Sequence, residues 1–266
     1  MQVPRLKGSA GRHWVVQGFG LLRRAVVPLL FITMLYLLVL VIAAAVPLVG
    51  VFAPLVLTPV LSVGMMHAAR AADQRRTPTP QMLFHGFRDN GGKAWKPLLV
   101  LGVLNAASTI AALGLSALAD GGVLVEIATG QISGDDARLR EAPLLWSILL
   151  FLVFYTPVQM ALWYAPLFVA WHGESPLKSM FFSLVAVLRN KAAFFQYGLT
   201  WMIVALLASL MIQVLRLVLG ASPWMMSLVL SPISLIVLAA LYCSFWPSYR
   251  DAVLTDGGTE IAQTPA

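Results

Sequence analysis

Histidines are the residues of this sequence best suited to hold a metal ion or a haem. His67 and His172 each lie near the end of a long apolar segment. Two neutral imidazoles at similar depth could bind haem or a transition metal. No cysteine or carboxylate cluster in the sequence supports them, and His13 and His85 lie in amphipathic stretches. We therefore interpret all four as structural or interfacial side chains, and we predict no metal site and no cofactor.

Polar residues inside the apolar segments offer a second kind of chemistry, a path for a small substrate. Asn105 and Gln159 are the candidates for such a path. The alternative is helix packing, because Ser108, Ala112 and Ser116 recur every fourth residue and small side chains let helices approach closely. We favour packing. The mid-segment polar residues are Asn105, Ser108, Thr109, Gln159, Gln196 and Gln213.

Ionisable groups at mid-depth, which proton-coupled transporters usually need, are missing from the apolar segments. Arg216 lies about one helical turn from a predicted segment end, and we expect it to snorkel or to pair with Asp120 or Glu126. Asp135 and Asp136 could bind a divalent cation weakly, but with Ser133 they better fit a helix cap. The phosphate-loop, metalloprotease and serine-hydrolase motifs are absent from the sequence, so we assign no catalytic residue.

Composition places the chain in a membrane. Of its 266 residues, 59% are hydrophobic and 11% are charged, whereas soluble domains carry about 25% charged residues. A water-soluble enzyme, a disordered chain and a disulfide scaffold are excluded, the last also because Cys243 is the only cysteine. The net charge of +7 fits loops that stay on the cytoplasmic side better than nucleic-acid binding.

Six apolar segments are long enough to cross a bilayer, which needs about 20 residues. We therefore predict an all-α integral membrane protein whose spans form three hairpins. A lead at 1–24 and a disordered tail at 255–266 flank a membrane domain at 25–254. The six spans are predicted at 25–46, 48–69, 97–119, 143–171, 192–219 and 223–246.

The basic residues predict the orientation of these spans. The lead, the connections after the second and fourth spans, and the tail together hold 15 of the 18 lysines and arginines. The positive-inside rule then places both termini in the cytoplasm of a bacterial inner membrane. The long connection at 120–142, which carries five acidic residues, is predicted to be periplasmic.

The order of elements repeats three times. A short stretch with aromatic and basic residues precedes each hairpin, as in the segments 14–24, 82–88 and 180–190. Such stretches favour amphipathic helices at the membrane surface. The second span of every hairpin contains proline, which predicts kinks. The tryptophans near span ends predict an aromatic belt at the membrane surface: Trp14, Trp95, Trp146, Trp171, Trp224 and Trp246.

Several of these stretches resemble an uncharacterised family of proteobacterial six-helix inner-membrane proteins. They include Thr58 to Met65, Trp163 to His172 and Ser248 to Asp251. The chain is also distantly similar to the membrane domain that precedes some glycerophosphodiester phosphodiesterases, which carry their catalysis in a separate barrel domain. The resemblance therefore implies a membrane fold and no reaction.

Three functions remain open from the sequence. We favour a non-enzymatic scaffold, accessory subunit or assembly partner of a membrane complex, with other membrane-protein subunits as partners. The first alternative is phospholipid binding or handling, with anionic headgroups at the basic cytoplasmic loops. The second alternative is a small-molecule channel or uniporter, which would need a path past Asn105 and Gln159. We expect no nucleic-acid partner.

Overall fold

Six membrane-length helices make up most of the structure, a computed structural model that describes residues 4–47, 49–132, 138–219 and 223–253. The described residues form helices and loops only, so the predicted all-α membrane fold with six spans is confirmed. The spans are α2 (Val26–Ala44), α3 (Ala53–Asp73), α5 (Trp95–Asp120), α8 (Leu144–Leu162) continued by α9 (Ala165–His172), α11 (Lys191–Leu219) and α12 (Pro223–Val253).

Shorter helices precede each pair of spans, as the repeat predicted. They are α1 (Ala10–Arg24), η1 (Pro80–Phe87) and α10 (Pro176–Arg189). The middle one is a 3₁₀-helix and not the expected amphipathic α-helix. Pro80 begins it and it ends after eight residues, and 3₁₀ geometry is common in such short pieces. The connections also hold α4 (Asp89–Gly92), α6 (Val123–Ala128) and α7 (Arg138–Glu141).

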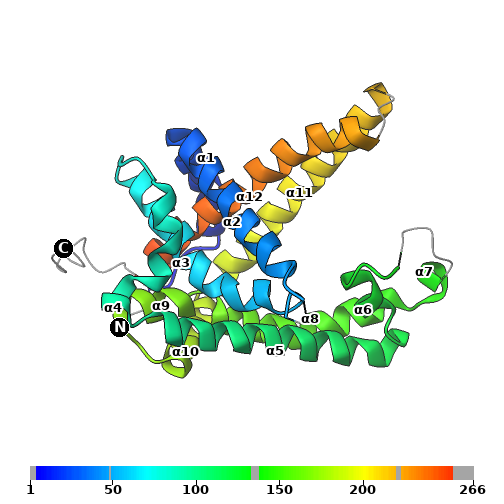
Figure 1. The fold of residues 1–266 in the computed structure, drawn as a ribbon, viewed down its shortest axis with the longest axis horizontal. Helices are drawn as coiled ribbons and strands as arrows, with labels where there is room; N and C mark the ends of the chain where they lie inside the picture. The colour runs from blue at the N-terminus through cyan, green and yellow to red at the C-terminus, as the bar shows by residue number, and fades with distance from the viewer. Residues whose placement is uncertain (1–3, 48, 133–137, 220–222, 254–266) are drawn as a thin grey trace.

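The three pairs of spans meet at one end of the molecule and separate toward the other. Figure 1 shows the pair α11–α12 diverging from the pair α5–α8. At the shared end α3 contacts both α9 and α12, and α1 packs across α11 and α12. We call this the basic end: it comprises α1, η1, α10 and the C-terminal ends of α3, α9 and α12.

The core lies where these helices meet. Ala68 and Ala72 of α3 and Ala239 of α12 are fully buried or nearly so, and their small side chains allow the helices to approach closely. Phe168 of α9 and Tyr249 of α12 are also buried, with their rings 6.1 Å apart. In its most apolar stretch α3 has 61% of its residues buried, whereas the most apolar stretch of α11 has none. The helix α3 therefore lies at the centre of the molecule, and α11 lies at its periphery.

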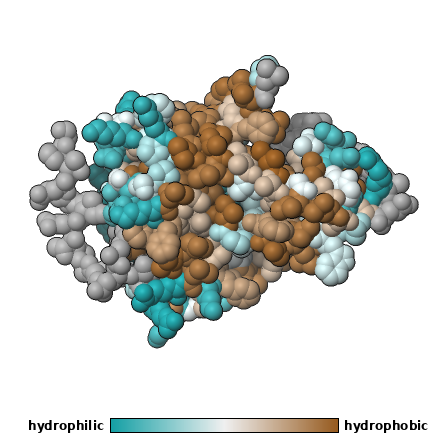
Figure 2. Space-filling model, turned by 90° about the horizontal axis from the view of Figure 1, so that it is seen from below, coloured by the Kyte–Doolittle hydropathy of each residue, from teal (hydrophilic) through white to brown (hydrophobic). Residues whose placement is uncertain are grey.

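The outer surface of the spans is apolar. Figure 2 shows a broad hydrophobic band between two hydrophilic ends. Large apolar side chains project outward along α8 and α11, for example Leu149, Val153, Leu206 and Leu210. Such a band would be unstable in water, and it matches the hydrocarbon layer of a membrane.

A break divides the fourth span into α8 and α9 at Trp163 and Tyr164. In an uninterrupted helix the Tyr164 N–H would donate to the Met160 oxygen. Here it donates to the Ser183 hydroxyl of α10 at 2.9 Å, and that hydroxyl donates to the Met160 oxygen at 2.9 Å. Pro166, which follows at once, has no N–H to continue the ladder. A side chain from the next repeat is thus inserted into the helix.

The aromatic belt is only partly confirmed. Trp95 and Trp146 are exposed, as expected for membrane-surface anchors. The prediction is wrong for Trp14 and Trp246, which are buried because each packs between helices of the basic end. The side chain of Trp224 lies outside the described residues.

Candidate functional site

Asp73, the last residue of α3, is the centre of a polar network at the basic end. Its carboxylate accepts hydrogen bonds from Arg24 Nη1 at 3.2 Å and from Arg250 Nη1 at 3.1 Å. The indole N–H of Trp246 donates to the same carboxylate at 2.8 Å. Arg24 belongs to α1 and the other two donors to α12, so one carboxylate connects three helices.

The bonds to Asp73 differ in what they contribute. The Arg24 side chain is 51% exposed, and exposed ion pairs contribute less than about 1 kcal/mol. The Trp246 indole is buried, and a hydrogen bond to a charged group contributes about 1.5–3 kcal/mol. Trp246 therefore does most to hold α12 against α3, and Arg24 can exchange its partner at small cost.

Arg250 ties the end of α12 to α1. Its Nη2 donates to the Gln17 side-chain oxygen at 2.9 Å, and its Nε donates to Asp251 at 3.0 Å. Asp251 in turn accepts a 3.0 Å hydrogen bond from the buried Trp14 indole. Each of these contacts joins segments more than 200 residues apart, except the one between neighbours in α12. These contacts join α1 of the first repeat to α12 of the last repeat.

Arg70, one turn before Asp73, lies between two tryptophans. Its guanidinium carbon is 5.6 Å from the ring centroid of Trp171 and 5.6 Å from that of Trp246. Arginine over an indole face is the favoured form of cation–π contact. The side chain therefore links α3 to the ends of α9 and α12.

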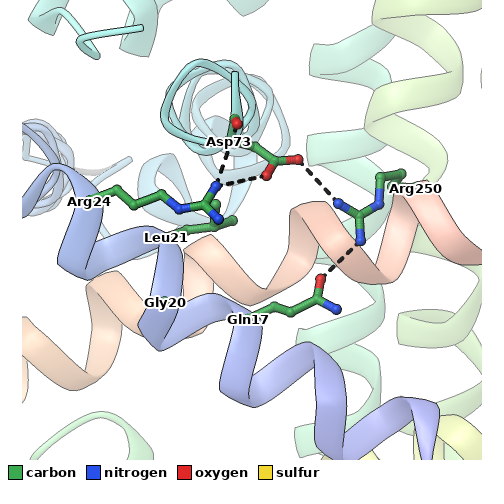
Figure 3. Close-up of a pocket in the computed structure, with 6 residues that line it drawn as sticks. All are labelled: Gln17, Gly20, Leu21, Arg24, Asp73 and Arg250. Atoms are coloured by element: carbon green, nitrogen blue, oxygen red, sulfur yellow. Dashed lines mark hydrogen bonds and ion pairs between the residues drawn. The ribbon is translucent and has the colours of Figure 1, made fainter. Parts of the chain in front are cut away.

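A cavity of about 360 Å³ opens beside this network. Figure 3 shows Arg24 of α1 and Arg250 of α12 pointing toward Asp73, and Gln17 of α1 pointing toward Arg250. We call this the basic pocket; it is lined by Gln17, Gly20, Leu21, Arg24, Asp73 and Arg250.

A second cavity, also about 360 Å³, shares Arg24 with the basic pocket. It extends past Arg75 and Arg76, which follow α3. Four arginines thus line the two cavities against one aspartate, Asp73. Both hydrogen bonds that the structure gives Arg24 use Nη1, which leaves the N–H groups of Nη2 and Nε for another acceptor. An anion is the ligand that this arrangement suits.

The chain is 39% identical over 255 residues to a probable inner membrane protein of Burkholderia thailandensis. The match covers 94% of this chain and 93% of that relative. The chain belongs to the family of that inner-membrane protein. No protein-family model and no solved structure matches it. Together with the six apolar helices, this establishes a multi-pass protein of the inner membrane in a proteobacterial family.

The histidines of this inner-membrane protein are not arranged as the sequence suggested. His67 does not face His172: it lies beside His85, with ring centroids 4.6 Å apart, and its Nε2 is 2.7 Å from Asp89. His172 instead is 2.9 Å from the Tyr249 hydroxyl. The expectation that no carboxylate supports these histidines is corrected by Asp89, which the loop after η1 brings back to α3.

The two polar candidates at mid-span meet each other. Gln159 Nε2 donates to the Asn105 side-chain oxygen at 3.0 Å, and Asn105 Nδ2 donates to the Leu55 oxygen at 3.0 Å. Ser108 and Ser116 donate to main-chain oxygens of their own helix, α5. The hydrogen bonds of Asn105 and Gln159 thus join α5 to α3 and α8, whereas those of the two serines stay within α5.

Residues of the predicted periplasmic connection have local roles. Asp120 accepts hydrogen bonds from the main-chain N–H groups of Gly122 and Leu124 at 2.8 and 2.9 Å, and so caps α6. Glu126 pairs with Arg138 at 2.8 Å. The side chain of Arg216 lies outside the described residues, as do Asp135 and Asp136.

Sequence reasoning missed Asp73 and Arg70 as site residues because it ended the second span at Ala69. A signal was present: His67, Arg70 and Asp73 recur every third residue, with alanines between them. Such spacing puts polar side chains along one face of a continuing helix, and α3 does continue to Asp73.

Proposed function

We propose that the basic pocket binds the phosphate-bearing headgroup of an anionic phospholipid, and that this inner-membrane protein is a lipid-binding protein. The observation that carries the proposal is the pair of cavities that share Arg24, lined by four arginines and one aspartate. Arginine is the residue best suited to phosphate oxygens, because its planar fork can donate two parallel hydrogen bonds.

The distribution of basic residues supports a cytoplasmic position for the pocket. With 15 of the 18 basic residues in the lead, two connections and the tail, the positive-inside rule assigns the basic end to the cytoplasm. The cytoplasmic leaflet is negatively charged, and each basic residue near it contributes about 1 kcal/mol of attraction. A pocket on the cytoplasmic side would be exposed to a high local concentration of lipid phosphate groups.

Apolar surface next to the pocket would accommodate acyl chains. Arg24 ends α1, and Val26 and Val27 begin α2 as exposed apolar side chains. A phospholipid with its phosphate at Arg24 would therefore have its chains along α2. The resemblance to the membrane domain of glycerophosphodiester phosphodiesterases, whose substrates derive from phospholipids, favours the same class of ligand.

The other sequence-based hypotheses stay predictions. A scaffold or accessory role, with other membrane subunits as partners, would be tested by co-purification with a defined complex. A channel would use the region of Asn105 and Gln159, where the polar side chains are engaged with each other and with Leu55.

Native mass spectrometry of the purified full chain tests the proposal. The protein would be titrated with phosphatidylglycerol and, separately, with phosphatidylcholine. Wild type should bind phosphatidylglycerol more tightly. Arg24→Gln should weaken that binding about fivefold, the equivalent of about 1 kcal/mol. Asp73→Asn should strengthen it, because the substitution removes the negative charge that competes for Arg24.

Arg23→Gln is the matched control, since Arg23 is the neighbouring exposed arginine of α1 but does not line either cavity. It should leave binding near the wild-type value. Equal effects of Arg24→Gln and Arg23→Gln would refute a specific pocket. Weaker binding in both Arg24→Gln and Asp73→Asn would show that the network is structural only. Circular dichroism would verify that each variant is folded.

A further inference from the structure

A second cluster of ligand-type side chains lies at the basic end, outside the basic pocket. His67 comes from α3, His85 from η1 and Asp89 from the first position of α4. His67 Nε2 is 2.7 Å from Asp89 Oδ2, and His85 Nδ1 is 4.0 Å from Asp89 Oδ1. One nitrogen from each histidine and one carboxylate oxygen all lie within 4.8 Å of one another.

Close backbone packing holds the two histidines together. A Cβ on Gly64 of α3 would lie 2.1 Å from the Leu83 main-chain oxygen, and a Cβ on Gly86 of η1 would lie 2.2 Å from the Val60 oxygen. Glycine at both positions is therefore required for η1 to lie against α3 at this distance. His67 and His85 are each one turn or less from these contact points, so their approach follows from the packing of the main chain.

The contacts of His67 Nε2 conflict with a simple hydrogen-bond network. The Trp171 indole N–H donates to this nitrogen at 3.0 Å, which requires a lone pair there. The Asp89 carboxylate is 2.7 Å from the same nitrogen, and an ionised carboxylate can only accept. One ring nitrogen cannot serve both partners. A cation bound by the imidazole lone pair and the carboxylate would resolve the contact between these two acceptors, and would take the place of the Trp171 hydrogen bond at this nitrogen.

We propose that His67, His85 and Asp89 form a binding site for a divalent transition-metal ion, with Zn²⁺ as the reference ion. Two imidazole nitrogens and one carboxylate oxygen are a donor set that suits zinc and its neighbours in the first transition series. Tetrahedral ligands at about 2.0 Å from zinc lie about 3.3 Å apart. The observed separations of 2.7 and 4.0 Å, each to a different oxygen of Asp89, lie on either side of that value.

The surroundings of the cluster suit metal binding. The side chains of His67 and Asp89 are 20% and 15% exposed, so the site is sheltered but open to an entering ion. The three protein ligands leave a fourth position for water or another donor.

Metal binding would join two repeats of the fold. His67 belongs to the first pair of spans, whereas η1 and α4 open the second. Trp171, which contacts His67, belongs to the end of the second pair. The bound ion would therefore fix η1 and α4 against α3, next to the Trp171 ring.

Cobalt titration of the full chain tests the site. The protein would be purified with an affinity tag that lacks histidine, stripped with a chelator and titrated with Co²⁺ while its visible absorption is recorded. Wild type should bind one equivalent, and Zn²⁺ should displace it. His85→Gln and Asp89→Asn should each weaken binding more than about tenfold, because loss of an outer partner alone costs about 10- to 100-fold.

His13→Gln is the matched control, since His13 is an exposed histidine of α1 outside the cluster. Its Co²⁺ binding should equal that of wild type. A wild-type protein without saturable Co²⁺ binding would overturn the proposal. Wild-type affinity in both His85→Gln and Asp89→Asn, verified as folded by circular dichroism, would overturn it as well.

Discussion

The side-chain amide of Asn105 donates a 3.0 Å hydrogen bond to the main-chain oxygen of Leu55, the oxygen that Pro59 leaves without its helical partner. The Gln159 side-chain N–H donates to the side-chain oxygen of Asn105 at 3.0 Å. A carbonyl that a proline leaves unpaired in the first pair of spans is thus satisfied by a side chain of the second pair, which the other helix of that pair holds in place. In hydrocarbon an unpaired carbonyl is costly, which explains why polar residues lie at mid-span.

Replacement of Asn105 should destabilise the protein. Asn105→Ala leaves the Leu55 oxygen without a partner, and we expect a loss of about 1–2 kcal/mol in the free energy of unfolding. Unfolding in mixed micelles of mild detergent and dodecyl sulfate measures it. Ser108→Ala is the control on the same helix, because Ser108 bonds only within α5, and it should change stability by less than about 0.5 kcal/mol.

The role of Pro59 makes the same contact testable by a double-mutant cycle. Pro59→Ala restores an N–H that can donate to the Leu55 oxygen, so Asn105→Ala should cost less in the Pro59→Ala background. Equal costs in both backgrounds would show that Asn105 acts through something other than this oxygen.

Ser183 should be needed for the break between α8 and α9. Ser183→Ala removes both the acceptor for Tyr164 N–H and the donor to Met160 oxygen, and we expect a loss of about 1–3 kcal/mol. Ser179 provides a matched control: it is equally buried on α10, one turn earlier, and its hydroxyl has no hydrogen-bond partner among the described residues. Ser179→Ala should be neutral or stabilising. Unfolding in the same mixed micelles measures both variants. Similar losses of unfolding free energy for Ser183→Ala and Ser179→Ala would contradict the insertion of the Ser183 hydroxyl between Met160 and Tyr164.

Much of the fold can be predicted from the sequence, because membrane-spanning helices are recognised by their length and their apolar composition. The six spans were predictable for that reason, and the short helices before each pair were predictable from the repeated order of aromatic and basic residues. The tryptophans show what such a prediction cannot give. Hydropathy places Trp14 and Trp246 near span ends but does not tell whether water, lipid or another helix covers them, and both are buried in contacts between helices.

The candidate sites were harder to predict because their residues come from distant segments. Asp73 and Arg250 are 177 residues apart, and nothing local to either shows that they meet. His67 and Asp89 are only 22 residues apart, but their approach depends on how closely η1 packs against α3 at Gly64 and Gly86. A local sequence pattern does not show which helix a glycine packs against, so this approach was not predictable.

The orientation of the basic end can be tested with single cysteines. Cys243 is buried, so the native chain should react little with a membrane-impermeant maleimide. Lys93→Cys, at an exposed position of the basic end, should be protected in intact spheroplasts and labelled after lysis. Ala128→Cys, exposed at the opposite end, should be labelled in both. Labelling of Lys93→Cys in intact spheroplasts would reverse the proposed topology and remove the basic pocket from the cytoplasmic leaflet.

Replacement of Arg70 by lysine or by methionine should destabilise the protein. Its guanidinium lies over the rings of both Trp171 and Trp246, and a planar group can stack on two faces at once, whereas an ammonium is a compact point charge. Arg70→Lys should therefore cost about 1 kcal/mol of unfolding free energy even though the charge is kept, and Arg70→Met about 1–2 kcal/mol. Mixed-micelle unfolding measures both, with Arg23→Lys as the exposed control that should be neutral. A wild-type stability for Arg70→Lys would mean that the charge alone matters. A more stable Arg70→Met would mean that the tryptophans need only an apolar neighbour.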